Sequence, residues 1–153
     1  MSELTLRDAI SLGLREALDK DPKVIIMGED VGAYNGAYVV TKGFLEDYGE
    51  TRIIDTPISE AGFVGAGIGA AMAGLKPVVE IMTINFSLMA SDQIINNAAK
   101  IHYMSGGQYS APIIIRTVTG GGAGLAATHS QSFEGFYATI PGLKVLTPAF
   151  PDD

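Results

Sequence analysis

The chain has 153 residues, of which 47% are hydrophobic and 18% are charged, with a formal net charge of −7 and no cysteine. The length suffices for one domain with a buried core, and the composition excludes the polar, highly charged type of chain that stays disordered. The negative charge argues against nucleic acid or an anionic membrane as partner, and the lack of cysteine excludes disulfides and thiolate metal sites.

The N-terminal segment predicts an amphipathic helix. In residues 5–21, TLRDAISLGLREALDKD, leucine or isoleucine recurs every four positions from Leu6 to Leu18. Thr5 followed by Asp8 resembles a capping box. No basic segment followed by an apolar run is present, as a signal peptide requires, and no later run is long enough to span a bilayer. We therefore expect a cytoplasmic protein.

Short apolar runs alternate with helical patterns along the rest of the chain. Strands are predicted at residues 23–30, 51–57, 76–82, 112–118 and 143–148, and helices at 41–49, 59–74, 85–104 and 133–140. Strands without a polar face, separated by helices, are typical of an α/β fold with helices on both faces of a parallel sheet. Because such a domain normally continues with another helix, we interpret the chain as truncated.

The residues that could carry chemistry follow the predicted strands. Ligands of open parallel sheets bind at the carboxyl ends of the strands. Glu29 follows the first strand, Glu60 the second, Met82 and Phe86 the third, and His129 lies in the loop after the fourth. The sequence therefore predicts a ligand site at that edge.

Glu60 is the only charge between Thr56 and Leu75, among small and apolar side chains. A carboxylate in the first turn of a helix is stabilised by the helix dipole, by about 0.3–1 kcal/mol. An ion pair is a second interpretation, although the segment contains no base. The functional alternative is a buried carboxylate with a raised pKa that shares a proton with a ligand nitrogen.

Two glycine-rich stretches have competing interpretations. GAGIGA, residues 65–70, partly matches a dinucleotide fingerprint, which keeps a nicotinamide-dependent oxidoreductase as an alternative. Its glycines lie well inside the predicted helix, however, and this favours close packing. TGGGAG, residues 119–124, fits either an anion cradle or a flexible loop over a site.

The chain has two histidines. A single histidine is more often structural, but His129 lies in the polar segment THSQS at the predicted ligand edge, where imidazole can exchange protons near pH 7. His102, between Ile101 and Tyr103 on a predicted helix, is interpreted as structural or interfacial.

Four segments carry a family resemblance: GEDVGAYNGAYVVTKGF, IIDTPISEAGFVGAGIGAAMAGLKPVVE, DQIINNAAKIHYMSGG and HSQSFEGFYATIPGLKVLTP. Together they resemble the beta subunits of the decarboxylating component of pyruvate dehydrogenase and of related 2-oxo acid dehydrogenases, from Leu4 to Pro148. The resemblance implies that residues 1–153 form a transketolase-like pyrimidine-binding domain, with the family's C-terminal domain absent.

The resemblance also implies a function. It predicts oxidative decarboxylation of a 2-oxo acid, most simply pyruvate, with acyl transfer to lipoyl groups. The cofactor would be thiamine diphosphate, whose magnesium is held by an alpha subunit in an α2β2 heterotetramer that docks on a dihydrolipoyl acyltransferase core. Activity would then require the alpha subunit and a full-length beta subunit, and a non-catalytic assembly module of the same fold is the alternative.

Site residues follow from the same resemblance. Glu60 would bond the pyrimidine N1′ and activate the cofactor, and His129 would donate protons or assist acyl transfer. The main chain of Ile58 would meet the pyrimidine edge, and Phe86 would pack on the ring. Two further residues would line the cofactor site, Glu29 and Met82.

Two details bear on metal and substrate. In some relatives a main-chain carbonyl at the position of Ile113 holds a structural potassium ion. Met82 and Met89 stand where some relatives have glutamine, so the resemblance leaves the acyl substrate open.

Overall fold

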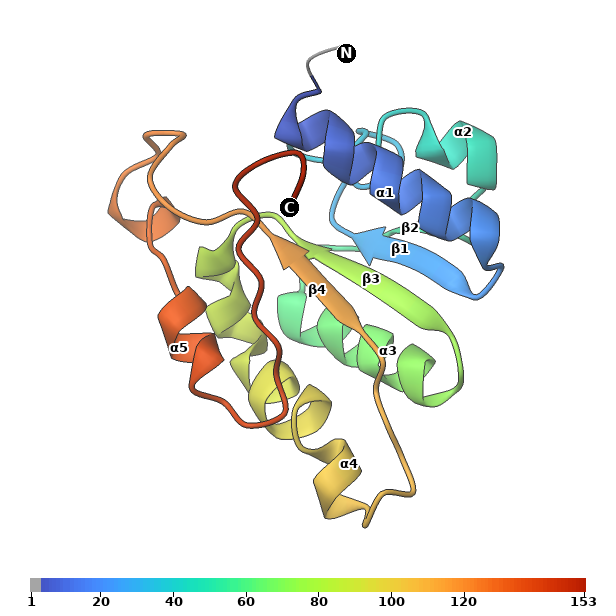
Figure 1. Ribbon diagram of the computed structural model, residues 1–153, viewed down its shortest axis with the longest axis vertical. Helices are drawn as coiled ribbons and strands as arrows, with labels where there is room; N and C mark the ends of the chain where they lie inside the picture. Colours follow the sequence, from blue (N-terminus) through green and yellow to red (C-terminus); the bar gives the residue numbers. More distant parts are fainter. Residues whose placement is uncertain (1–3) are drawn as a thin grey trace.

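A four-stranded parallel sheet forms the centre of the computed structural model, which describes residues 4–153 (Figure 1). Its strands lie in the order β2-β1-β3-β4. They are β1 (Val24–Gly28), β2 (Ile53–Asp55), β3 (Lys76–Ile81) and β4 (Ile114–Thr117). In register, Ile26 of β1 faces Ile53 on one side and Val78 on the other. Because all pairs are parallel, the carboxyl ends of the strands meet at one edge.

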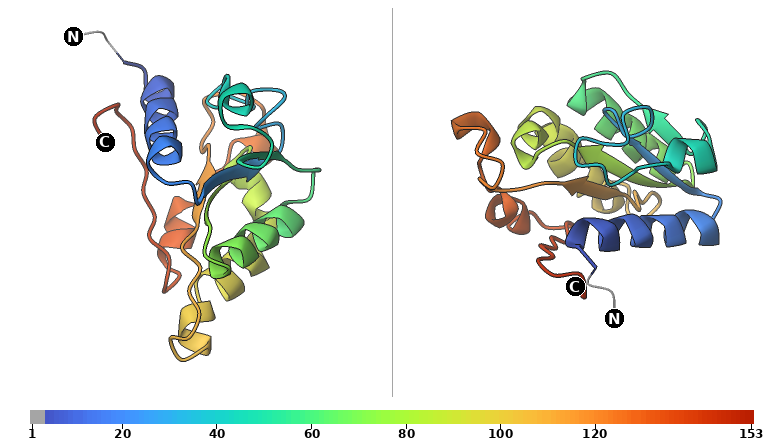
Figure 2. Two further views of the ribbon diagram at one scale, coloured as in Figure 1. Left: turned by 90° about the vertical axis from the view of Figure 1, so that its right-hand side faces the viewer. Right: turned by 90° about the horizontal axis from the view of Figure 1, so that it is seen from above.

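Helices cover both faces of the sheet, which confirms the predicted α/β class (Figure 2). On one face α1 (Leu6–Lys20) and α2 (Phe44–Tyr48) enclose a core with Leu18, Ile26 and Phe44. On the other face α3 (Glu60–Met72) packs on alternate residues of the same strands, such as Met27 and Val79. Among residues 4–153 no helix is both long enough and apolar enough to cross a membrane.

Local interactions cap α1, as the sequence predicts, and join it to α2. The backbone N–H of Asp8 donates to the Thr5 hydroxyl oxygen at 3.2 Å, so Thr5 is the N-cap. Arg15 of α1 lies over the Phe44 ring, 4.4 Å from its centroid, and pairs with Asp47 at 2.6 Å. Helix α1 is thereby joined to α2 by a cation–π contact and an ion pair.

The glycines of α3 do not all have the same role. A Cβ on Gly67 would lie 2.6 Å from Cγ2 of Val79, so this glycine permits the close approach of α3 to β3. A Cβ on Gly65 would lie 3.2 Å from the Gln93 side chain, whereas one on Gly69 would meet nothing within 4 Å. Close packing within this chain is confirmed at Gly67 and Gly65, whereas Gly69 packs against nothing in the described residues.

The single long helix predicted for residues 85–104 is wrong. The segment divides into a 3-10 helix η1 (Ile84–Ala90), a π-helical turn η2 (Gln93–Ala98) and the short α4 (Ile101–Met104). Two polar side chains bond locally in η1: Asn85 donates to the Thr83 hydroxyl, and Ser87 donates to the carbonyl of Ile84. Such local bonds compete with regular α-helical geometry.

The strand predicted at residues 143–148 is also wrong, because this segment forms no regular element. Leu143 and Val145 pack against the core on the α3 side, while Leu146 is 86% exposed. The alternation in the sequence indicated correctly that one side of the segment is buried. The segment does not pair with a neighbouring strand, however, as a β-strand must. The remaining predicted helix is shorter than expected, as α5 (Glu134–Ala138), and a 3-10 turn η3 (Ala127–His129) precedes it.

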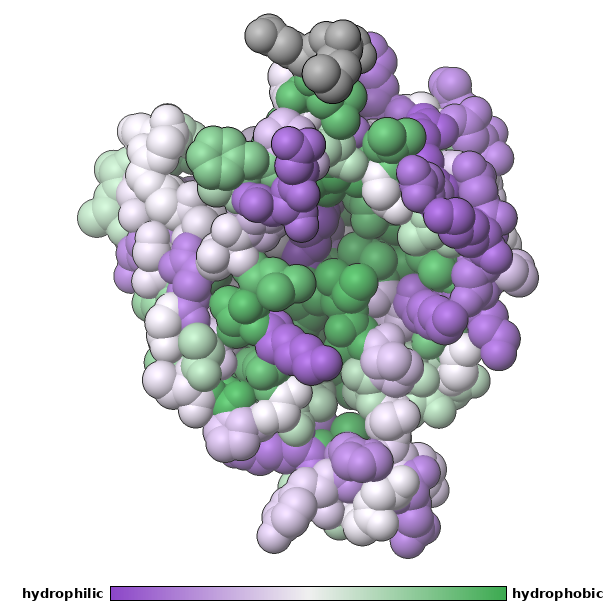
Figure 3. Space-filling model, in the orientation of Figure 1, coloured by the Kyte–Doolittle hydropathy of each residue, from purple (hydrophilic) through white to green (hydrophobic). Residues whose placement is uncertain are grey.

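One part of the sheet surface is left open beside α1. The face in Figure 3 is hollowed and carries apolar surface over β3 and β4. Ile114 is paired in register with Val78, so its side chain points to the α1 side, and it is 62% exposed. Helix α1 therefore covers only the part of this face nearest to β1 and β2.

We expect opposite effects from adding a methyl group at two glycines of α3. Gly67→Ala should lower the free energy of unfolding by about 1–2 kcal/mol, since overpacking against Val79 outweighs the gain in helix propensity. Gly69→Ala should raise it by up to about 1 kcal/mol, because only the propensity term acts. Urea unfolding followed by circular dichroism measures both, and equal effects would contradict the packing role of Gly67.

Candidate functional site

Two buried carboxyl groups lie at the carboxyl edge of the sheet. Glu29 directly follows β1 and is 4% exposed, and Glu60 is the first residue of α3 and is 8% exposed. Atom Oε1 of Glu29 is buried without a hydrogen-bond partner, and none of the ion pairs among residues 4–153 includes Glu60. The ion-pair interpretation of Glu60 therefore finds no support in the described residues.

The electrostatics of the pair are unequal. Burial raises the pKa of the Glu29 carboxyl above its ordinary value, and the negative charges of Glu60 and Asp30 raise it further. Glu29 follows the end of β1 and Glu60 begins α3, which contacts β1, so the two carboxyl groups lie at the same edge of the sheet. Glu60 lies in the N-terminal turn of α3, where the helix dipole favours a negative charge.

The chain around Glu29 is held in place by Asp55. Its carboxylate, at the end of β2, accepts backbone N–H bonds from Gly32 at 2.6 Å and Ala33 at 2.8 Å. Thr41 closes the same loop by donating to the carbonyl of Val31 at 2.6 Å. Asp55 is not among the predicted site residues, because it lies inside the strand predicted at residues 51–57, whereas in the structure β2 ends at this residue.

A small cavity adjoins the first turn of α3. It has a volume of about 250 Å³ and is lined mostly by apolar atoms of residues from β1, the β2–α3 connection and α3, including Met27, Phe63 and Ala66. Thr56, which also lines it, has a buried hydroxyl oxygen without a partner. An apolar wall with unsatisfied polar atoms beside it is typical of a small-molecule site.

A second pair of predicted residues meets at the same edge. The rings of Phe86, in η1, and His129, in η3, stand edge to face with centroids 5.2 Å apart and planes at 84°. The hydroxyl of Thr128 lies 2.9 Å from Nδ1 of His129, which leaves Nε2 of the imidazole as the atom free to meet a ligand. Segment η1 also packs on α3, so the two pairs border one region.

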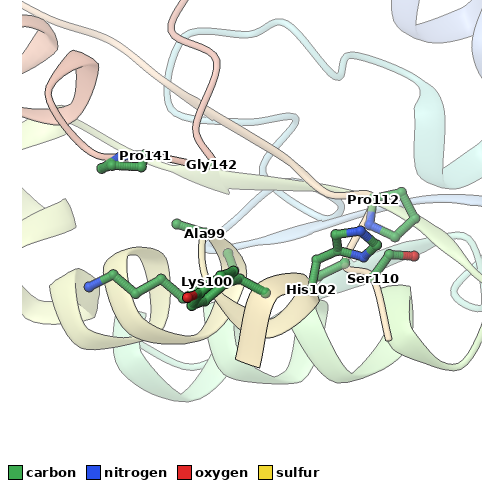
Figure 4. A pocket seen from close by; sticks show the side chains of 10 residues that line it. Ala99, Lys100, His102, Ser110, Pro112, Pro141 and Gly142 are labelled. Carbon is green, nitrogen blue, oxygen red and sulfur yellow. The ribbon is translucent and has the colours of Figure 1, made fainter. Parts of the chain in front are cut away.

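A larger cavity lies away from these residues. It has a volume of about 720 Å³ and is lined by Lys100, His102 and Pro112 among others, near the amino end of β4 (Figure 4). Its lining contains no carboxylate, and Nδ1 of His102 is occupied by the carbonyl of Tyr109 at 3.0 Å. None of the catalytic candidates lines this larger cavity, whereas the smaller one adjoins the first turn of α3, which begins with Glu60.

Comparison with known proteins agrees with this geometry. Residues 2–153 match the family described as "Transketolase, pyrimidine binding domain".

The chain belongs to this family.

Its relatives include beta subunits of the pyruvate dehydrogenase E1 component. The mitochondrial subunit beta-1 of Arabidopsis thaliana is 57% identical over 99% of this chain. The mitochondrial subunits beta of Bos taurus and Homo sapiens are each 54% identical over 99% of this chain. The chain spans 42% of the length of these three relatives. A solved structure titled "Split gene transketolase, inactive beta4 tetramer" matches 92% of this chain and 41% of its own, with a TM-score of 0.64 and 21% identity, which shows the fold alone.

Three other predicted residues of this pyrimidine-binding domain differ in placement. Met82 follows β3 at the site edge and is half-buried. The side chain of Ile58, between β2 and α3, is 83% exposed. Ile113 precedes β4, at the opposite edge of the sheet, and its side chain lies against the position of Gly67. The structure therefore does not bring Ile113 to the site.

The fingerprint GAGIGA does not lie where a dinucleotide site needs it. Residues 65–70 fall inside α3, which begins at Glu60, so these glycines do not surround the helix N-terminus. The glycine-rich loop is bonded at its base by the N–H of Gly120 to the carbonyl of Gln131 at 3.1 Å, and its tip is exposed. Residues 4–153 contain no group of three or more His, Asp or Glu side chains arranged to hold a metal ion.

A buried ion pair beside the site also escaped the sequence analysis. Glu80 of β3 and Arg116 of β4 are register partners and form a salt bridge, and Nε of Arg116 is buried without a partner. The signal in the sequence was one charge inside each of two otherwise apolar predicted strands, negative in Glu80 and positive in Arg116. The pair joins the carboxyl ends of β3 and β4, from which Met82 and the glycine-rich loop continue.

We expect Glu29→Gln to stabilise the chain at neutral pH and not at acid pH. Folding raises the pKa of Glu29, so ionising this group disfavours the fold; the penalty is full above the folded-state pKa and absent below the ordinary value of about 4.5. The variant should gain on the order of 1 kcal/mol at pH 7 and nothing at pH 4.

Thermal unfolding at the two pH values measures this effect. The control is Glu50→Gln, which removes an exposed carboxylate. A gain for Glu29→Gln that is the same at both pH values would contradict the assigned cause.

Proposed function

We propose that this chain is the pyrimidine-binding part of the beta subunit of a 2-oxo acid dehydrogenase acting on pyruvate, with its active site shared with an alpha subunit. About 55% identity along the whole chain to subunits of that name supports the proposal. The observation that carries it is the buried pair Glu29 and Glu60 at the carboxyl edge of the sheet, where a small apolar cavity adjoins the first turn of α3. A buried carboxyl pair in which the pKa of Glu29 is raised can hold a proton for exchange with a bound heterocycle.

The residues present fit thiamine diphosphate. The buried hydroxyl of Thr56, which has no partner, borders the apolar cavity, and the unpartnered Oε1 of Glu29 is buried at the same edge of the sheet, which suits a flat ring with polar edge atoms. Glu60 would hold a ring nitrogen and the main chain of Ile58 the ring edge, while Phe86 would pack on the ring. Two further residues would line the site, Glu29 and Met82. When bound, the cofactor supplies an electron sink for decarboxylation.

Glu60 moves the proton in this proposal. Its carboxyl group would hold a ring nitrogen of the cofactor through a hydrogen bond and would give up or take back one proton at that bond. Neighbouring Glu29, whose pKa is raised by burial and by Glu60, stays protonated to higher pH and so keeps the pair from carrying two charges. The pair can thus hold one proton between two carboxyl groups.

His129 acts at the edge of the same site. Its ring is half-buried and held by the Phe86 edge and by Thr128, so Nε2 is presented toward incoming groups. A neutral imidazole in this position donates or accepts the proton that accompanies acyl transfer to a lipoyl group. Decarboxylation itself does not require this proton.

The outward side of α3 is assigned to the alpha subunit. Exposed small residues recur there at helical spacing, and Met72 lies exposed at its end. They are Gly62, Ala66, Gly69 and Ala73. Such a surface lets another backbone approach closely, and the alpha subunit would bring the magnesium and the diphosphate-binding groups. The acyltransferase core as a further partner and a cytoplasmic location both stay predictions, and the relatives named above are mitochondrial by name.

We expect Glu60→Gln to abolish decarboxylation in the beta subunit assembled with its alpha subunit. The amide cannot exchange a proton, so a loss of at least about 100-fold follows from losing acid–base catalysis. The measurement is pyruvate decarboxylation with an artificial electron acceptor, together with the size of the assembly by light scattering.

The matched control is Glu134→Gln, which removes a first-turn acid of α5. If Glu60 acted only through the helix dipole, both variants would lose a few tenths of a kcal/mol of stability and keep their activity. Retained activity in Glu60→Gln would overturn the proton-transfer role.

We expect His129→Ala to impair acyl transfer more than decarboxylation. The rate of acetylation of a lipoyl domain should fall by about 100-fold, and decarboxylation with the artificial acceptor should change by much less. Mass spectrometry of the lipoyl domain measures the first step. His102→Ala is the control, because its ring bonds to the Tyr109 carbonyl away from the site. Equal losses in both steps would contradict the assignment.

A further inference from the structure

Asn85 links the body of the domain to the loop that carries His129. It lies in η1, next to Phe86, and is 6% exposed. Its side-chain oxygen accepts the backbone N–H of Gln131 at 3.1 Å, and its side-chain nitrogen donates to the Thr83 hydroxyl at 2.6 Å. Both ends of the amide are therefore used, one inside its own segment and one in the loop.

The main chain of Gln131 forms the two hydrogen bonds that close the base of the loop. Its carbonyl accepts the N–H of Gly120 at 3.1 Å, while its own N–H donates to Asn85. The main chain on one side of His129 is thus joined to both the start of the glycine-rich loop and to η1. Between these points, residues 121–128 are exposed, so few other contacts fix the loop.

Segment η1, which contains Asn85, is held in place by several hydrogen bonds. The backbone N–H of Ile84 donates to the carbonyl of Val118 at 2.8 Å, directly after β4. Ser87 is buried, donates to the carbonyl of Ile84 and accepts from the Tyr137 hydroxyl at 2.7 Å. Segment η1 is therefore fixed to the sheet and to α5, and Asn85 and Phe86 present two contacts from it, one to the loop and one to the imidazole.

We propose that Asn85 is a positioning residue that sets the place of His129 through the main chain of Gln131. The inference rests on the proposed function for its catalytic consequence, while the tethering of the loop stands on the geometry alone. Displacing a reacting group by about 1 Å can lower a rate by about 100-fold, so one hydrogen bond two residues from the imidazole is enough to matter.

If Asn85 had a purely structural role, Asn85→Ala would leave His129 in its place. The bond from Gln131 to Asn85 is only part-buried, so water can replace the lost acceptor, and the stability lost in Asn85→Ala comes mainly from the buried bond to the Thr83 hydroxyl. The bond from Tyr137 to Ser87 is fully buried and does not involve the loop. Tyr137→Phe is therefore the matched control, because it breaks a bond to η1 without releasing His129.

The first measurement follows the two imidazole rings of the 153-residue chain by proton NMR. In Asn85→Ala the Cε1 proton of His129 should lose the ring-current shift that the Phe86 ring imposes, while that of His102 stays in place. In Asn85→Asp a carboxylate oxygen still accepts from Gln131, so the wild-type shift should return. In Tyr137→Phe neither signal should move. An unchanged His129 signal in folded Asn85→Ala overturns the proposal.

The second measurement is kinetic and uses the beta subunit assembled with its alpha subunit. Asn85→Ala should lower the acetylation rate of a lipoyl domain about 10- to 100-fold with a much smaller change in decarboxylation, and Asn85→Asp should restore most of it. If Asn85→Ala moves the NMR signal but leaves acetylation unchanged while His129→Ala lowers it, the positioning role is overturned and the proposed function stands. If His129→Ala also leaves acetylation unchanged, the role of His129 in the proposed function has failed, and the positioning role fails with it.

Discussion

The close approach of α3 to the sheet at Gly67 is the contact on which the site depends. Without a side chain at this position, the helix lies directly against Val79 in the middle of β3. The first turn of α3 then comes beside the end of β1, where Glu29 follows Gly28. A larger residue at position 67 would move the helix outward and separate the two carboxyl groups. The apolar packing of the core therefore determines how far apart the two carboxyl groups lie at the carboxyl edge of the sheet.

The free-energy cost of burying two carboxyl groups at this edge has to be offset by the rest of the fold. Two carboxyl groups taken out of water repel each other and lose hydration, which disfavours folding. The structure limits the penalty in two ways: Glu60 begins a helix, and Glu29 has a raised pKa and so is more readily neutral. An unpartnered Oε1 on Glu29 nevertheless remains. Groups that are costly to bury and lack partners in the protein are explained most simply by a ligand that supplies them.

The sequence predicted the fold better than it predicted distances within the site. Apolar runs such as VIIM and PVVEI identified the parallel strands, because residues buried on both faces leave a continuous signal. Glu29, Glu60 and His129 were found because each follows a strand. The Glu80–Arg116 pair and the Asp55 contacts were not found, because they depend on which strands are neighbours and on how a loop folds back. Such information is not contained in local periodicity.

The sequence prediction fails most clearly between residues 85 and 104, and this failure is informative. The apolar spacing there fits one long helix, yet Asn85 and Ser87 direct their hydrogen bonds into local partners, and η1 becomes a 3-10 helix. A regular α-helix starting at Asn85 would use a different main-chain geometry, and the Phe86 ring and the Asn85 amide would no longer point to the His129 loop from adjacent positions. Local irregularity of this kind tends to persist where function requires it. Of the two residues that break the helix, Asn85 thus also holds the loop that carries the imidazole, while Ser87 accepts the hydrogen bond from α5.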